Sequence, residues 1–232
     1  MRIFTLPGVF KPRSDSRLLA RVLCEQLPAD GARVLDLCTG SGIVGVSAAR
    51  HRRADVTVVD VSRRAVLTAR LNARLNGTRV QGRRGDLLAA VAGERFDAIV
   101  SNPPYLPSET DDLPGRGPER AWEGGRDGRA LLDRIVAAAP AHLRPGGLVL
   151  LVFSEVCGTQ HVLDGLRAGG LDAEVVVRDR GPLGPLLGER AARLVEQGLL
   201  APGQTEEDVV VVRAVAPRTA PQRSPQLATT EV

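Results

Sequence analysis

Short apolar segments with strand character alternate with helical segments along most of this sequence. The expected strands are rich in Val, Ile and Leu, and Gly, Asp or Asn bounds several of them. Apolar runs separated by helices are typical of βαβ units, in which helices cover both faces of parallel strands. The sequence therefore predicts an α/β fold with a doubly wound, Rossmann-like and mostly parallel sheet.

Apolar periodicity and turn residues give the approximate bounds of these elements. Ser14 or Asp15 is expected to cap the first helix, and Ser62 the third. The expected strands cover 33–37, 55–60, 78–81, 96–101, 148–153, 173–177 and 209–215. The expected helices cover 14–26, 43–50, 62–76, 130–141, 161–168 and 187–197.

The chain is expected to form one catalytic domain with additions at its ends. Residues 1–30 form an N-terminal segment and helix, and residues 31–216 form the main α/β domain. Residues 178–205 interrupt the strand and helix rhythm and are expected to be an insertion. Residues 217–232 are polar and rich in Pro, Ser and Thr, and we expect a flexible tail.

Composition excludes several classes of protein. The formal net charge is +4, but the arginines are scattered and form no long run, and aromatic residues make up only 3%. These features argue against a dedicated nucleic-acid surface. The widely spaced Cys24, Cys38 and Cys157 predict neither a disulfide framework nor a metal site. Without a long apolar segment, the chain is expected to be cytoplasmic, with no membrane contact.

A glycine-rich turn follows the first expected strand. Gly40, Gly42 and Gly45 satisfy the pattern GxGxxG, and the expected turn covers residues 38–42. Glycine permits a tight turn between strand and helix and a close approach of the backbone to a ligand. This pattern alone is equally compatible with a nicotinamide-dependent dehydrogenase.

Three carboxylates near strand ends refine the interpretation. Asp36 lies four residues before Gly40, where it would repel a pyrophosphate but suit the ammonium and sulfonium of S-adenosylmethionine. Asp60 ends the second strand, where an acid can accept hydrogen bonds from ribose hydroxyls of either cofactor. Asp86 is either an adenine ligand or a simple turn acid.

The run Asn102-Pro-Pro-Tyr105 directly follows a buried strand and is the most specific motif. Ligands of open α/β sheets bind outside the carboxyl ends of strands, so this turn should face the cofactor. Prolines fix the backbone and remove donors, which leaves carbonyl acceptors in a rigid frame. Asn102 adds a side-chain acceptor, and Tyr105 can stack on a planar substrate. The turn therefore predicts positioning of a planar –NH2 group for methyl transfer.

Together these motifs resemble class I methyltransferases that modify nitrogen, and in detail the HemK-type protein glutamine N5-methyltransferases. The similarity extends over residues 8–155, and the chain resembles the short type without an N-terminal helical domain. The similar stretches are Val9–Leu19, Leu35–Gly42, Val59–Val66, Ser101–Tyr105 and Ala121–Gly128.

This resemblance implies a fold, a cofactor, an acceptor and partners. The sheet would have seven strands with a reversed final strand, and the cofactor would be S-adenosyl-L-methionine. Asn102, Pro103, Pro104 and Tyr105 would hold the acceptor, a protein glutamine such as that of a translation release factor. Eukaryotic members work with a small zinc-containing activating subunit. The cofactor residues would be Asp15, Asp36, Cys38, Thr39, Gly40, Gly42, Asp60, Val61, Asp86, Leu87 and Asn102.

Three other functions stay open from the sequence. The same turn is compatible with methylation of the exocyclic amine of adenine in RNA or DNA, which requires an unpaired or flipped base. A biosynthetic N-methyltransferase acting on a small molecule is also compatible. A nicotinamide oxidoreductase or a non-catalytic nucleotide-binding module is disfavoured by Asp36 and by the turn at Asn102.

Overall fold

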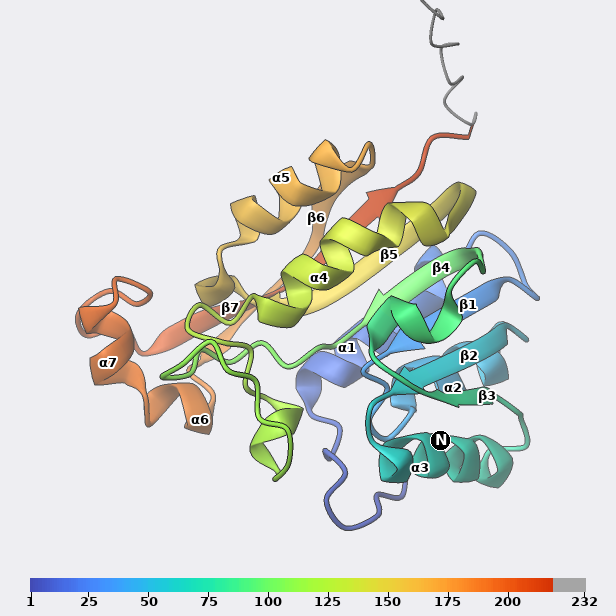
Figure 1. The fold of residues 1–232 in the computed structure, drawn as a ribbon, viewed down its shortest axis with the longest axis horizontal. Helices are drawn as coiled ribbons and strands as arrows, with labels where there is room; N and C mark the ends of the chain where they lie inside the picture. The colour runs from blue at the N-terminus through green and yellow to red at the C-terminus, as the bar shows by residue number, and fades with distance from the viewer. Residues whose placement is uncertain (219–232) are drawn as a thin grey trace, which may run out of the picture.

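The computed structural model describes residues 1–218, which form a seven-stranded sheet with helices on both faces (Figure 1). The strand order is β3-β2-β1-β4-β5-β7-β6, and β7 alone runs antiparallel to its neighbours. The predicted mostly parallel sheet with a reversed final strand is confirmed. The strands are β1 Arg33–Leu37, β2 Asp55–Asp60, β3 Gln81–Arg84, β4 Phe96–Ser101, β5 Leu143–Ser154, β6 Asp172–Pro182 and β7 Glu206–Val215.

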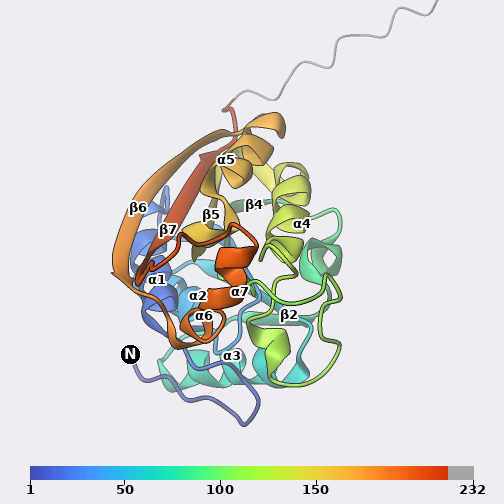
Figure 2. The same cartoon turned by 90° about the vertical axis from the view of Figure 1, so that its left-hand side faces the viewer.

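The helices form two layers around this sheet, as Figure 2 shows. One face packs against α4 and α5, and the other against α1 and α2, so each face has its own apolar core. Buried leucines of α1 belong to the same core as the sheet, so the N-terminal helix is integral to the fold. The helices are α1 Ser14–Gln26, α2 Ile43–His51, α3 Arg63–Leu75, α4 Ala130–Ala138, α5 Thr159–Ala168, α6 Pro185–Gly188 and α7 Ala191–Glu196.

Several predictions at element ends are wrong. β5 begins at Leu143 instead of 148, and α4 ends at Ala138 instead of 141. Ser14 and Asp15 do not cap α1, because the N-cap is Arg13 and both residues lie inside the helix. The third strand occupies Gln81–Arg84 instead of 78–81. Thr78 N donates to Ala73 O across the left-handed Gly77, so residues 76–78 close the end of α3 and the strand begins later. Ser62 does cap α3, since its side chain accepts from Ala65 N.

The segment 178–205 is only partly an insertion. Residues 178–182 continue β6, where they pair with the beginning of β7. Backbone pairing with β7 holds these charged residues in the strand, and an exposed cross-strand ion pair joins Arg180 to Glu206. The single helix expected over 187–197 is divided into α6, which ends at Gly188, and α7, which begins at Ala191; Glu189 and Arg190 lie between them.

The remainder of this segment packs beside the long loop that follows β4 (Figure 1). Leu187, Leu194 and Leu200 form a small apolar cluster with Leu106 of that loop. Arg190 donates to Pro107 O at 2.7 Å and to Glu123 at 3.2 Å. The segment therefore supports the loop that begins at the turn Asn102–Tyr105.

The predicted tail and the predicted absence of membrane contact concern features that residues 1–218 show only in part. The expected tail 217–232 lies almost wholly outside the described residues, which end at Arg218. Within residues 1–218, no helix combines the length and the apolar character needed to cross a membrane.

Candidate functional site

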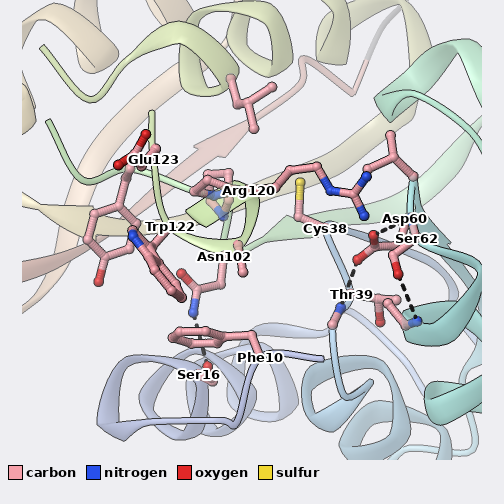
Figure 3. A pocket seen from close by; sticks show the side chains of 18 of the residues that line it. Phe10, Ser16, Cys38, Thr39, Asp60, Ser62, Asn102, Arg120, Trp122 and Glu123 are labelled. Carbon is pink, nitrogen blue, oxygen red and sulfur yellow. Dashed lines mark hydrogen bonds between the residues drawn. The ribbon is translucent and has the colours of Figure 1, made fainter. Parts of the chain in front are cut away.

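A cavity of about 420 Å³ opens where β1, β2 and β4 end. Parallel strands bring their carboxyl ends to one edge of the sheet, so residues far apart in sequence meet there. The glycine-rich turn, Asp60 and the turn after β4 all line this cavity, as do residues of the N-terminal segment. Figure 3 shows side chains from these elements pointing into the common space.

Asp36 holds the glycine-rich turn from within the protein. Its Oδ2 accepts from the Thr39 hydroxyl at 2.6 Å and from Gly45 N at 3.0 Å. Burial raises the pKa of Asp36 to about 7, while these two hydrogen bonds oppose the shift. Asp36 is only 1% exposed and borders the cavity, so a carboxyl group whose pKa is near neutral lies at the cavity wall.

Gly40 and Gly42 have different roles in that turn. Gly40 lines the cavity, whereas Gly42 lies outside the cavity lining. Gly42 has φ +81°, and a Cβ there would lie 2.6 Å from the Ala69 Cβ. Gly42 therefore permits the close approach of the turn to α3, and it shapes the site from behind.

Asp60 binds the turn from the neighbouring strand. One carboxylate oxygen accepts from Gly40 N at 3.1 Å, and the other accepts from Ser62 N at 2.8 Å. Burial raises the pKa of Asp60, and these backbone donors and Arg120 oppose that shift. Carboxylate oxygens can accept further hydrogen bonds, so Asp60 can still bind hydroxyl groups of a ligand in the cavity. Val61 follows it in the cavity wall.

The cavity is also lined by Cys38, which follows β1, and by Asp86 and Leu87, which follow β3. Burial raises the pKa of the Cys38 thiol, so it stays protonated and contributes an apolar surface. Asp86 forms an ion pair with Arg134 at 2.5 Å. Arg134 thus holds the Asp86 carboxylate at the edge of the cavity. The sequence left open whether Asp86 is an adenine ligand or a turn acid.

The turn after β4 is held by α1. The Asn102 side-chain nitrogen donates to Asp15 Oδ2 at 3.1 Å and to Ser16 Oγ at 3.0 Å. The Tyr105 hydroxyl donates to the same Asp15 oxygen at 3.0 Å. Burial, and then the nearby charge of Asp15, raise the pKa of Tyr105, so the hydroxyl remains a donor. Figure 3 shows the Asn102 nitrogen directed to Ser16 and its oxygen directed away.

The backbone of this turn is fixed by contacts from behind. The Cys157 thiol lies 3.1 Å from Tyr105 O. A Cβ at Gly128 would lie 2.3 Å from that same oxygen, so only glycine fits there. Leu106 N donates to Trp122 O, which pairs the turn with the loop 121–128 that the sequence singled out. The turn is therefore rigid on its protein side and open on its cavity side.

The structure adds lining residues that the sequence analysis missed. Ser16 follows Asp15, and its pairing with Asn102 depends on how α1 packs. Arg120 extends across the cavity toward Asp60, as Figure 3 shows. The segment between β6 and β7 contributes Leu186 and Leu187, and β7 contributes Glu207. The loop 121–128 was the one sequence feature that pointed near Arg120.

Comparison with known proteins identifies the family. Residues 1–113 match the methyltransferase small domain family. The chain is also 33% identical over 188 residues to a protein of Methanocaldococcus jannaschii that carries the provisional name protein N5-glutamine methyltransferase. The match covers 81% of this chain and 93% of that protein. The chain belongs to the protein N5-glutamine methyltransferase family. It is thus a methyltransferase, and the nicotinamide oxidoreductase alternative is excluded.

Two further family comparisons define how far the similarity extends. The release factor glutamine methyltransferase of Moorella thermoacetica is 38% identical over 174 residues, which cover 71% of this chain and 60% of that enzyme. The chain therefore matches only part of the length of that bacterial relative. In structure, it resembles one chain of the E. cuniculi Mtq2–Trm112 complex, which is described as responsible for methylation of the eRF1 translation termination factor. The TM-score is 0.63 at 24% identity, covering 90% of this chain and 99% of the other.

Proposed function

We propose that this methyltransferase transfers a methyl group from S-adenosyl-L-methionine to the side-chain amide nitrogen of a glutamine in a protein. The observation that carries the proposal is the arrangement at Asn102. Both hydrogens of its amide are engaged by α1, and its oxygen is left as an acceptor toward the cavity. An acceptor at that place fits an –NH2 group.

The cavity suits S-adenosyl-L-methionine by its charge. Asp36 and Asp60 contribute two carboxylates to one lining, beside the glycine-rich turn, while the charge of Asp86 is paired with Arg134. Such a wall favours a ligand with an ammonium, a sulfonium and ribose hydroxyls, and it repels a pyrophosphate. When bound, the cofactor supplies a methyl group on a positively charged sulfur, which retains the electron pair of the broken C–S bond. Thr39, Cys38, Val61 and Leu87 complete the walls around it.

The residues of the turn would then prepare the acceptor nitrogen. A glutamine amide nitrogen is a poor nucleophile because its lone pair is delocalised into the carbonyl group. A hydrogen bond from its N–H to Asn102 Oδ1 raises its electron density, and carbonyl oxygens beside Pro103 and Pro104 can accept the second hydrogen. The Tyr105 ring supports the plane of the amide. The nitrogen lone pair would form the new N–C bond, and one amide proton would leave to solvent after the transfer. Catalysis by this turn consists of orientation and polarisation.

The acceptor side of the cavity favours a protein substrate. The segment 183–205 supplies Leu186 and Leu187 there, and β7 supplies Glu207. We propose that this segment contacts residues that flank the target glutamine. The named relative from M. thermoacetica and the E. cuniculi complex support a translation release factor as substrate and a small activating subunit as partner.

Calorimetric titration with S-adenosylhomocysteine tests the cofactor assignment. We expect a saturable binding isotherm with one site, while NAD under the same conditions gives no heat of binding. Binding of NAD alone would contradict the carboxylate argument. S-adenosylhomocysteine binding without methylation of any glutamine protein would instead leave the cofactor site intact and refute the proposed acceptor.

The pKa of Asp36 predicts how cofactor affinity depends on pH. Because this pKa is raised to about 7, the carboxyl group is neutral below that pH and charged above it. A charged Asp36 attracts the ammonium and sulfonium groups, so affinity for S-adenosylmethionine should increase from pH 6 to pH 8 by roughly tenfold. Calorimetry across this range measures the effect. The variant Asp36→Asn should show weak binding that is nearly independent of pH, and a steep dependence retained in it would contradict the assignment.

Removal of the Arg190 side chain should weaken binding of the acceptor protein more than binding of the cofactor. Arg190 ties the segment 183–205 to Pro107 and Glu123, so Arg190→Ala should loosen the acceptor wall. Loss of these charge-assisted hydrogen bonds is expected to raise the KM for the protein substrate about tenfold, with cofactor affinity unchanged. Arg180→Ala, at an exposed ion pair of β6 and β7, is the matched control. Equal effects of the two variants would argue against a substrate role for the segment.

A further inference from the structure

Asp15 collects hydrogen bonds from both polar side chains of the turn after β4. Its Oδ2 accepts from Asn102 at 3.1 Å and from the Tyr105 hydroxyl at 3.0 Å. Its Oδ1 accepts from Ser16 N at 2.6 Å, which fixes the carboxylate on the first turn of α1. Asp15 is only 8% exposed, so water competes little for these bonds. The contacts join residues 87 and 90 positions apart in the chain.

This arrangement fixes which end of the Asn102 amide faces the cavity. An amide has a donor end and an acceptor end of nearly equal size, and rotation by half a turn exchanges them. A carboxylate only accepts, so it attracts the –NH2 end and repels the carbonyl end. The Ser16 hydroxyl donates to Asp15 Oδ1 at 3.3 Å, which directs its lone pairs to the second amide hydrogen. Both α1 side chains therefore favour one orientation.

The orientation determines which acceptor the turn can hold. With Oδ1 toward the cavity, Asn102 accepts a hydrogen bond from an –NH2 group and repels a carboxylate. With the amide reversed, it would donate to a carboxylate and oppose an –NH2 group. Nearby Pro103 and Pro104 have no N–H, so their backbone offers no compensating donor. The choice between glutamine and glutamate at the acceptor site thus depends on the amide orientation.

We propose that Asp15, assisted by Ser16, is the positioning residue that holds Asn102 in the orientation selecting an amide acceptor over a carboxylate. This rests on the proposed function and extends it to the selectivity of the site. Asp15 acts through Asn102 and Tyr105, and it need not touch the acceptor. Loss of the Asp15 carboxylate should lower turnover and weaken the preference for glutamine over glutamate. The affinity for the cofactor should change little.

The variant Asp15→Asn tests the proposal with the least change in shape. An asparagine offers both a donor and an acceptor, so it no longer excludes the reversed Asn102. For a glutamine peptide we expect kcat to fall about 10- to 100-fold, because charge-assisted bonds position the amide. A peptide with glutamate in place of the target glutamine serves as a competitive inhibitor. Its affinity, relative to that of the glutamine peptide, should rise about tenfold in the variant. Ser16→Ala should shift both quantities in the same direction by less.

The control is Glu25→Gln, the same change of carboxylate to amide at an exposed position of α1. It should leave turnover and the preference for glutamine unchanged. A variant Asp15→Asn that is folded but retains the wild-type preference would overturn the proposal, even with low kcat. Loss of S-adenosylhomocysteine binding in step with kcat would do the same, because it would assign Asp15 to the cofactor.

Nuclear magnetic resonance of the Asn102 side chain separates this inference from the proposed function. The resonance is assigned by its absence in Asn102→Ala. In the wild type without acceptor, both amide protons should exchange slowly, and Asp15→Asn should accelerate that exchange. If the wild type methylates adenine and no glutamine, the proposed function fails, but slow exchange would still support the orienting role. Fast exchange of both protons in the wild type would refute it.

Discussion

Asn102→Ala is expected to lower kcat by about 10²- to 10³-fold or more, because it removes the side-chain acceptor that orients and polarises the acceptor nitrogen. Although the resemblance also places Asn102 beside the cofactor, affinity for S-adenosylhomocysteine should be nearly unchanged, since Asp36 on β1, Asp60 on β2 and the glycine-rich turn after β1 remain in place. Single-turnover methylation of a glutamine peptide measures the first quantity, and calorimetry measures the second. A large loss of kcat with nearly unchanged affinity for S-adenosylhomocysteine is therefore the specific expectation.

Two comparisons make this result interpretable. Gln160→Ala removes an exposed amide on α5 and should leave both quantities unchanged. A thermal melt of Asn102→Ala close to that of the wild type would show that the sheet is intact. Near-normal turnover in folded Asn102→Ala would mean that the turn after β4 does not hold the acceptor, and the assigned chemistry would be wrong.

Asp60→Ala is expected to have its largest effect on the cofactor. Asp60 aligns Gly40 and Ser62 and retains oxygen lone pairs toward the cavity, so its removal disorders the turn and deletes acceptors for ligand hydroxyls. Hydrogen bonds to charged groups contribute about 1.5–3 kcal/mol each, so the Kd for S-adenosylhomocysteine should rise at least about tenfold and up to about 100-fold. Calorimetric titration measures this change.

The same strand supplies the control for Asp60. Asp55→Ala changes the opposite end of β2, outside the cavity, and should leave cofactor affinity unchanged. Asp60→Asn keeps one acceptor oxygen and should fall between the wild type and Asp60→Ala. An unchanged Kd in Asp60→Ala would remove this residue from the cofactor site.

The strands that carry the site were predictable from local sequence. β1, β2 and β4 begin and end where expected, because each is a short, mostly apolar segment bounded by turn residues. β3 is shifted because it is short and polar, and its place depends on pairing with Thr57 and its neighbours on β2. The division of α6 from α7 depends on the packing of Leu187 and Leu194 into one cluster, which no local period encodes.

The candidate site likewise contains residues that local sequence predicted and residues whose position depends on packing. The sequence predicted that Asp36, Asp60 and Asn102 lie together because they are at ends of predicted strands, and all three line the same cavity. Ser16 and Leu186 were missed because their contacts with the cavity depend on how α1 and the segment 183–205 pack. Gly42 was assigned from its motif to the cofactor, whereas in the fold its missing Cβ makes room for Ala69. Its place in the motif is explained by packing.

The central claim is tested most directly by locating the transferred methyl group. The full chain would be incubated with S-adenosylmethionine labelled in its methyl group and a purified translation release factor, with and without a small activating subunit. Fragmentation mass spectrometry of the product would locate the label. We expect label on the side-chain nitrogen of one glutamine and none when that glutamine is replaced by glutamate. Label on adenine of an added RNA, or none on glutamine although S-adenosylhomocysteine binds, would contradict it.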